Sequence, residues 1–370
     1  MKIINVVGAR PNFMKIAPLM EAYKTHPEIE PVLVHTGQHY DEKMSDTFFR
    51  ELGIAEPDVN LGVGSASNTV QTADIMKAFE EVCIKYRPDM VLVVGDVNST
   101  VACSIAAKQR HVAVIHYEAG IRSFDRTMPE ELNRLVTDSI ADYFLVTEQS
   151  AIDNLKNEGH AEDKIHFVGN LMIDTLMANK DKAEQKNTYQ GYNLHKDNYA
   201  LLTMHRPVNV DDPEILRKFV DSFEQIAFWM PIIYPVHPRA GKNLRQFNLW
   251  QRFSSMKNII LSEPVGYHDM LNLQMNCKFI MTDSGGMQEE SSVLRKPCIT
   301  LRAATERPVT VDKGSSVLAG NDTGKLLEYV DMIKNGMFKL SGDIPLWDGK
   351  AAQRIVEKIR LLQRLPNRVD

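Results

Sequence analysis

The 370-residue chain is 44% hydrophobic and 25% charged, which is ordinary for a globular protein and favours two folded domains over one. Its formal net charge of -5 argues against nucleic acid or a membrane surface as a general partner, while leaving room for a local basic pocket. No apolar stretch is long enough to cross a membrane. The cysteines are far apart and lack metal or redox spacing, so we expect a cytoplasmic protein with reduced, buried thiols at Cys83, Cys103, Cys277 and Cys298.

Continuous apolar, β-branched runs alternate with helical patterns along the whole chain. Such runs are typical of parallel strands buried on both faces, and intervening helices indicate βαβ units. We therefore expect strands at 3–8, 31–36, 90–96, 113–118, 143–147, 165–169, 199–205, 231–237, 259–263, 278–283 and 298–301. The clearest helices are expected at 17–25, 73–86, 100–109, 132–141 and 214–228.

The strand signal stops after Asn170, and a polar segment between Met177 and Lys196 separates the two halves. This segment is typical of a helix followed by a connection, and a new apolar core begins at Tyr199. We therefore expect two doubly wound α/β domains, over 1–170 and 171–350. An amphipathic helix, expected over 351–370, ends the chain.

Polar residues follow the apolar runs on their carboxyl side in both halves. They are Arg10, Gln38-His39, Asp96, Glu118, His205, His237 and Asp283. Any single one could be a strand leaving for solvent. In open parallel sheets, however, ligands bind at the carboxyl edge. Two sheets whose carboxyl edges face each other across a cleft would gather all of these groups around one ligand.

The stretch 279–290 has the layout of an anion-binding site. An apolar run stops at Asp283, Gly285-Gly286 follows, and a helix begins. Ser284 would be the N-cap, the first-turn N–H groups would face a ligand, and the glycines would let a phosphate approach the backbone. Glu290, about two turns into the helix, could reach a hydroxyl of the sugar that carries the phosphate. The alternative is an ordinary capped connection between a strand and a helix.

Cationic side chains follow strands in both halves. Arg10 lies in the turn after the first strand, and Lys15 lies one helical turn further along. In the second half, His205-Arg206 and His237 end strands, and Arg307 follows the last one. Each alone could be a solvated loop residue, but the shared edge favours a diphosphate pocket. The first turn is not Gly-x-Gly-x-x-Gly, so nothing indicates a nicotinamide or flavin cofactor.

Carboxylates gather at the strand ends of the first half. Asp96 could be a helix cap, and the helix dipole favours Glu130 and Glu131 in the first turn after Pro129. Together with Glu118, however, they exceed what capping needs. Like charges that lie close together raise the pKa of at least one carboxyl, which makes an acid and a base available near neutral pH. With no zinc spacing, Walker loop or nucleophile elbow, these groups suit chemistry on the sugar of a nucleotide diphosphate sugar.

Ten motifs in order along the chain resemble those of the non-hydrolysing UDP-N-acetylglucosamine 2-epimerases. They are Gly8-Ala9-Arg10-Pro11, Thr36-Gly37-Gln38-His39, Gly95-Asp96, 116–122, 129–134, Gly169-Asn170, His205-Arg206, 234–238, 283–290 and 305–308. The resemblance implies two Rossmann-like domains facing across a cleft, of the glycosyltransferase-B type, with the last helix packing back on the first domain. It further implies a homodimer without a cofactor or metal that interconverts UDP-GlcNAc and UDP-ManNAc.

The resemblance also implies a mechanism and residues for it. The C2 hydrogen is not acidic, so UDP leaves by anti elimination, gives 2-acetamidoglucal, and is added back after C2 is protonated on the other face. By position, the acid/base carboxylates are Asp96, Glu118 and Glu130. By the same matching, the leaving diphosphate is stabilised by Arg10, His205, Ser284, Gly285 and Gly286, and the ribose is bound by Glu290. Further substrate-binding groups are Lys15, Arg206, His237 and Arg307.

Several positions depart from the family pattern and leave more than one function open. Gln38, Arg206 and His237 match part of the set that binds a second, activating UDP-GlcNAc in some bacterial members. The segment 62–68, however, lacks the arginine of that set, and Pro207 replaces a second arginine. The substrate could also be a related UDP-sugar with a 3-acetamido group or a uronic acid. The chain could instead be a hydrolysing epimerase, a glycosyltransferase of the same fold or a non-enzymatic nucleotide-sugar-binding protein.

Overall fold

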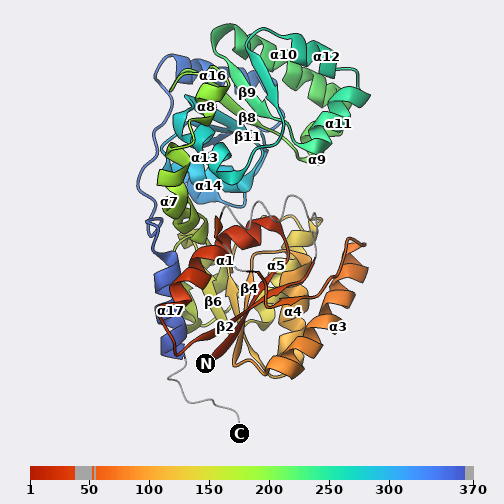
Figure 1. Ribbon diagram of the computed structural model, residues 1–370, viewed down its shortest axis with the longest axis vertical. Coiled ribbons are helices and arrows are strands. Elements are labelled where there is room, and N and C mark those ends of the chain that lie inside the picture. Colours follow the sequence, from red (N-terminus) through yellow and green to blue (C-terminus); the bar gives the residue numbers. More distant parts are fainter. Residues whose placement is uncertain (38–51, 54–55, 363–370) are drawn as a thin grey trace. The chain divides into compact units, whose positions relative to one another are not determined.

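The computed structural model describes residues 1–37, 52–53 and 56–362. The chain divides into two compact units, which we call the first unit (Met1–Met177 with Pro345–Asp370) and the second unit (Ala178–Ile344). Each contains a parallel sheet with helices between its strands (Figure 1). The two α/β domains expected from the sequence are therefore confirmed in kind.

The described part of the first unit contains a seven-stranded sheet in the order β3-β2-β1-β4-β5-β6-β7, and every neighbouring pair is parallel. The strands are β1 (Lys2–Val7), β2 (Glu30–His35), β3 (Val59–Asn60), β4 (Met90–Val94), β5 (Ala113–Tyr117), β6 (Tyr143–Val146) and β7 (Ile165–Phe167). The helices are α1 (Arg10–Tyr23), α3 (Asn68–Tyr86), α4 (Asn98–Gln109), α5 (Pro129–Ile140), α6 (Gln149–Asn157), α7 (Leu171–Glu184), which continues past Met177, and α17 (Ala351–Leu362). All five residues of β4 are buried, as expected for a central parallel strand.

The last described helix, α17, packs against α1 within the first unit (Figure 1). Asp174 of α7 holds its start, because the carboxylate accepts hydrogen bonds from the backbone N–H groups of Ala351 (3.0 Å) and Ala352 (2.7 Å). These contacts satisfy N–H groups that a helix leaves without intrahelical partners. They return the end of the chain to the unit in which it began.

The second unit contains a six-stranded parallel sheet in the order β10-β9-β8-β11-β12-β13. The strands are β8 (Ala200–Thr203), β9 (Ile232–Pro235), β10 (Ile259–Ser262), β11 (Phe279–Thr282), β12 (Cys298–Thr300) and β13 (Ser316–Leu318). The helices are α8 (Thr188–Gly191), α9 (Pro207–Val210), α10 (Pro213–Trp229), α11 (Pro238–Gln246), α12 (Trp250–Ser255), α13 (Tyr267–Asn276), α14 (Gly285–Val293), α15 (Pro308–Asp312) and α16 (Thr323–Lys334).

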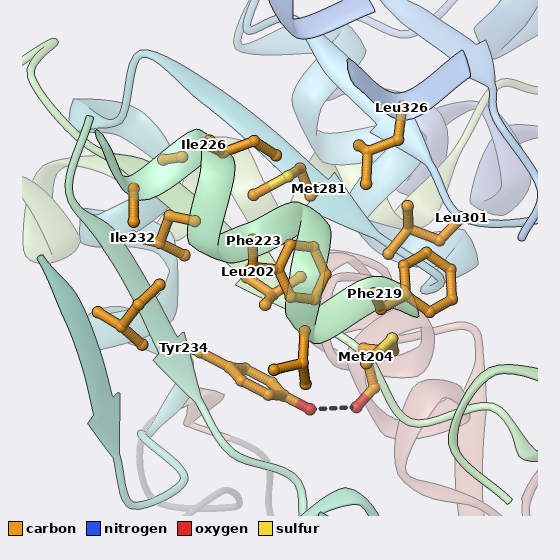
Figure 2. Close-up of a cluster of buried hydrophobic side chains, with 14 of the residues drawn as sticks. Leu202, Met204, Phe219, Phe223, Ile226, Ile232, Tyr234, Met281, Leu301 and Leu326 are labelled. Carbon is orange, nitrogen blue, oxygen red and sulfur yellow. Dashed lines mark hydrogen bonds between the residues drawn. The ribbon is translucent and has the colours of Figure 1, made fainter. Parts of the chain in front are cut away.

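A large apolar cluster between α10 and the sheet forms a core of the second unit (Figure 2). Phe219 and Phe223 of α10 are fully buried and stack with ring centroids 5.8 Å apart. Tyr234 of β9 is also fully buried, and its hydroxyl donates a 2.7 Å hydrogen bond to the carbonyl oxygen of Met204. This bond satisfies the buried hydroxyl and fixes the backbone where β8 ends.

The six strands of the second sheet follow the same order as the first six strands of the first sheet, which creates a defined ligand-binding edge in each. The chain moves outward in one direction from β1 and from β8, then returns to the other side at β4 and β11. The crevice outside the carboxyl ends of the strands at such a switch point is where open α/β sheets bind ligands. A ligand site is therefore expected at the residues just after β1 and β4, and at those just after β8 and β11.

The eleven strands expected from apolar runs are all present. The two that the sequence did not indicate, β3 and β13, have only two and three residues, too few for a recognisable run. The first helix begins at Arg10 rather than at residue 17, because Pro11 suits the first turn of a helix. The four cysteines are free and buried, as expected. Among the helices of the described segments, none has the length and apolar character needed to cross a bilayer.

Candidate functional site

A buried ion pair occupies the edge of the first sheet near its switch point. Glu118 follows β5, and its Oε2 lies 2.7 Å from Nζ of Lys15 in α1, with both side chains at most 10% exposed. Gly95, which follows β4, lies beside this pair. A Cβ on Gly95 would be 3.3 Å from Glu118 Oε2 and 3.8 Å from Lys15 Nζ. The structure thus brings two predicted site residues together and keeps the neighbouring backbone free of a side chain.

The backbone of Glu118 is strained. Its φ is +70°, a left-handed conformation that a long side chain seldom adopts. Its N–H group donates to the carbonyl oxygen of Leu145 in β6, which holds the backbone in place. Strain of this kind costs about 1–3 kcal/mol and is concentrated at functional sites. The strained backbone of Glu118 is consistent with the site function that the sequence predicts for this residue.

Asp96 is held by an arginine that the sequence did not single out. Arg134 donates from Nε (3.1 Å) and Nη2 (2.6 Å) to Oδ2 of Asp96, and the side chain of Asn133 donates to the backbone oxygen of Asp96. The Arg134 side chain is only 5% exposed, whereas that of Asp96 is 33% exposed. The carboxylate is thus anchored from inside the unit and remains open to solvent. Asp96 and Glu118 each face a cation of their own.

The adjacent residues Glu130 and Glu131 have different environments at the start of α5. Glu131 is buried and accepts hydrogen bonds from the Ser123 and Phe124 backbones and from Arg134. Burial raises the pKa of Glu131, but these hydrogen bonds outweigh it and hold the pKa below its ordinary value. Glu130 is exposed. Glu131 thus holds the loop at Ser123 and Phe124 rather than capping α5, and a ligand contact of Glu130 remains a prediction.

A buried histidine fixes the turn that carries Asp96. His116 has Nδ1 2.6 Å from Oδ1 of Asp138 and Nε2 2.8 Å from the backbone oxygen of Gly95. These two contacts hold the ring between Asp138 and the turn at Gly95. Arg122 also pairs with Asp138 at 2.7 Å, which balances the charge of this buried group. Sequence reasoning missed His116 and Asp138, although His116 lies two residues before Glu118.

In the second unit, Asp283 organises the turn after β8. This fully buried carboxylate accepts hydrogen bonds from the backbone N–H groups of His205 (2.9 Å) and Arg206 (2.8 Å) and from the side chain of Asn209 (3.0 Å). It also lies 2.8 Å from Nδ1 of His205. Burial raises the pKa of Asp283, but the hydrogen bonds and charge of His205 outweigh it, and the pKa lies below its ordinary value.

The contact with Asp283 orients His205 for a ligand. Because Nδ1 donates to the carboxylate, Nε2 is the ring atom left to contact a ligand, and the side chain is 41% exposed. The ring of His237 lies 5.3 Å from the ring of His205. His237 also caps α11, because its Nδ1 accepts from the N–H group of Arg239. The structure therefore brings together two histidines that the sequence placed at separate strand ends.

Helix α14 starts at the end of β11, as the sequence predicted. Ser284 is at the N-cap position, but its hydroxyl caps no N–H group of the described helix. Its own N–H donates to Thr282 Oγ1 at 3.0 Å. A Cβ on Gly285 would have no described atom within 4 Å, so the space beside the first turn is open. Ser284 thus leaves the first-turn N–H groups of Gly285 and Gly286 without a cap among the described residues, as an anion site requires.

The two remaining predicted residues of the second unit have internal partners. Arg307 Nε lies 2.5 Å from Oε1 of Glu289. Glu290 is 4% exposed and accepts hydrogen bonds from Tyr267 Oη (3.0 Å) and Gln274 Nε2 (2.7 Å). Burial raises the pKa of Glu290 to about 7. Contact of these two residues with a ligand remains a prediction. Gln38 and the side chain of Arg10 lie outside the described residues.

The raised pKa of Glu290 predicts a dependence of stability on pH. The folded protein binds this proton more tightly than the unfolded chain, so the free energy of unfolding should fall as pH rises from about 4.5 to about 7. Glu290→Gln should remove this slope, and the variant should gain stability relative to wild type at pH 8 but not at pH 4. Urea unfolding at both pH values measures the difference. An equal difference at the two pH values would contradict the prediction.

Comparison with known proteins gives the family. The model of the UDP-N-acetylglucosamine 2-epimerase family matches residues 21–360. Over 362 residues the chain is 41% identical to UDP-N-acetylglucosamine 2-epimerase of Methanocaldococcus jannaschii, covering 96% of this chain and 98% of that protein. It is 35% identical to UDP-2,3-diacetamido-2,3-dideoxy-D-glucuronate 2-epimerase of Pseudomonas aeruginosa, covering 98% and 100%. The crystal structure of the M. jannaschii enzyme with UDP-GlcNAc and UDP has a TM-score of 0.88 at 40% identity, covering 98% and 100%.

Proposed function

Because this chain belongs to the UDP-N-acetylglucosamine 2-epimerase family and is therefore an isomerase, we propose that it interconverts UDP-GlcNAc and UDP-ManNAc by releasing and re-adding UDP. Both units act on one substrate molecule in this proposal. The second unit supplies most of the groups that bind the diphosphate, and carboxylates of the first unit move the proton at C2. No NAD takes part, because the C2 hydrogen leaves as a proton and not as a hydride.

The second unit supplies the groups that stabilise the leaving diphosphate. The C1–O bond breaks, and its electron pair goes to a phosphate oxygen that the first turn of α14 and Nε2 of His205 stabilise. Uncapped N–H groups and a histidine held by a buried carboxylate are preorganised for this charge. Arg206, His237 and Arg307 of the same unit add positive charge to substrate binding, and Glu290 binds the ribose. Arg10 and Lys15 add positive charge from the first unit.

The first unit supplies the proton transfer. One carboxylate takes the C2 proton as the C1–O bond breaks, which forms the C1=C2 double bond of 2-acetamidoglucal. Return of a proton to the opposite face of C2 and of UDP to C1 completes the epimerisation. Asp96, Glu118 and Glu130 are the acid/base groups. The observation that carries the proposal is the strained, buried Glu118 beside Lys15, because a glycosyltransferase of the same fold needs no base at C2.

A second candidate substrate is a UDP-sugar with a 3-acetamido group and a uronic acid. The similarity to the P. aeruginosa 2-epimerase of that specificity favours it. Incubation with each UDP-sugar, without NAD and without an acceptor, followed by NMR identifies the substrate and the product. We expect a UDP-linked 2-epimer. Free ManNAc with UDP would indicate a hydrolysing epimerase instead. Binding of all UDP-sugars without turnover would contradict the proposal.

A further inference from the structure

A buried arginine outside the sequence motifs lies at the ligand-binding edge of the second sheet. Arg302 follows β12, is 8% exposed, and donates from Nη2 to Oε1 of Glu306 at 2.5 Å. Its Nη1 is buried and makes no hydrogen bond with any described residue. Burial of a guanidinium nitrogen without a hydrogen-bond partner costs free energy, which is a reason to expect that Nη1 binds a ligand.

The register of the sheet places Arg302 beside the anion site. Thr282 of β11 pairs with Thr203 of β8 on one side and with Thr300 of β12 on the other. The ladder continues by one residue on each side, because Asp283 N–H donates to the oxygen of Thr203 and Leu301 N–H donates to that of Thr282. Two residues beyond the paired threonines, the three chain segments therefore carry His205, Ser284 and Arg302 at matching positions. Neighbouring strands lie about 4.8 Å apart, so these residues form a row at one edge.

The charged side chains at this edge also place Arg302 near the end of β11. Burial raises the pKa of Glu306, but the hydrogen bond and charge of Arg302, and more weakly the charge of Arg206, lower it to about 2. These two arginines follow β12 and β8, which flank β11. Because both act on one carboxylate, their charges gather near the end of the strand that leads to Ser284. The guanidinium groups of Arg302 and Arg206 therefore lie at the same edge as the carboxylates of Glu306 and Asp283.

We propose that Arg302 is a further ligand of the diphosphate, with Nη1 donating to a phosphate oxygen of the bound UDP-sugar beside the first turn of α14. The inference rests on the proposed function. In this arrangement Glu306 orients the guanidinium through Nη2, and Nη1 adds a charge-assisted hydrogen bond to the oxygens that gain charge as UDP leaves. The alternative is that Arg302 has only a structural function, in which its ion pair with Glu306 holds the loop that precedes α15.

Binding of UDP and of uridine separates the two possibilities. Arg302→Lys should raise the Kd for UDP by about 10- to 100-fold, because lysine cannot bind Glu306 and a phosphate with two separate nitrogens. The affinity for uridine, which has no phosphate, should stay unchanged. Arg252→Lys is a matched control, since Arg252 pairs with Asp221 and Glu224 at the exposed surface, and it should leave both affinities unchanged. Calorimetry measures UDP binding, and NMR titration measures uridine binding.

Two further variants keep the test decisive. Glu306→Gln should lower the melting temperature while leaving the Kd for UDP within about threefold, because Arg302 stays to donate. If Arg302→Lys folds poorly, the double variant Arg302→Gln with Glu306→Gln removes both charges together and should fold, yet lose UDP affinity. Equal loss of UDP and uridine affinity, or no loss of either, would overturn the assignment of Arg302. Failure of the wild-type protein to bind UDP would instead count against the proposed function.

Discussion

Replacing Glu118 by glutamine should slow proton exchange at C2 by roughly 10²- to 10⁴-fold, because a neutral amide cannot take up the proton. The change keeps the size of the side chain and can keep the contact with Lys15, whose Nζ lies 2.7 Å from Oε2. UDP affinity should change little, since the variant loses a base and no cation. The exchange rate is measured by NMR in D2O and UDP binding by calorimetry.

Arg10→Ala is the variant to compare with Glu118→Gln, because it should affect UDP binding more than proton exchange at C2. It should weaken UDP binding, because it removes charge-assisted hydrogen bonds of about 1.5–3 kcal/mol each. Exchange at C2, measured at saturating substrate, should fall less than in Glu118→Gln. If the two variants lose UDP affinity and exchange in the same proportion, the division of labour between base and diphosphate ligands is wrong.

Replacing Asp283 by asparagine should destabilise the protein and weaken UDP binding together. The buried carboxylate accepts from the backbone of His205 and Arg206 and from Asn209, and an amide NH2 group would face these donors. Removal of one partner from such a group costs about 3 kcal/mol. The amide oxygen would also be a weaker acceptor for His205 Nδ1 than the carboxylate, so the ring would be held less firmly toward a phosphate. We therefore expect a rise in the Kd for UDP of about 100-fold.

Urea unfolding and UDP calorimetry of Asp283→Asn measure the two losses. Asp212→Asn is the matched control, because Asp212 caps the exposed start of α10 and asparagine is an equally good cap. The folded pKa of Asp283 is lowered, so its contribution is present above about pH 4 and is lost as pH falls below that value. The destabilisation by Asp283→Asn should shrink accordingly in acid. UDP binding equal to that of wild type would refute the ordering function of Asp283.

The fold could be predicted from the sequence because its signal is local. Parallel strands buried on both faces leave continuous apolar runs, as in β4, and these runs can be recognised without knowledge of the partner strand. The position of Ser284 at the start of α14 could be predicted for the same reason. The absence of a capping hydrogen bond from its hydroxyl could not, because a side-chain rotamer depends on its surroundings.

The partners in the site could not be predicted, because they come from distant parts of the chain. Lys15 and Glu118 are separated by 103 residues, and nothing in either motif specifies the other. Arg134 lies in one of the family motifs, but its function becomes visible only when it reaches Asp96, 38 residues away. Arg302 lies outside every motif and is identified only by its burial and by the register of β12 with β11.

The elimination route is tested most directly by incubating the wild-type protein in D2O, without NAD, with UDP-GlcNAc that carries oxygen-18 in the bond between C1 and the diphosphate. NMR follows the label at C2 and the position of the heavy oxygen. We predict deuterium at C2 of both epimers and migration of oxygen-18 to non-bridging positions of the phosphate, because UDP leaves and returns. Epimerisation that retains the C2 hydrogen and the original bridging oxygen would contradict the proposal.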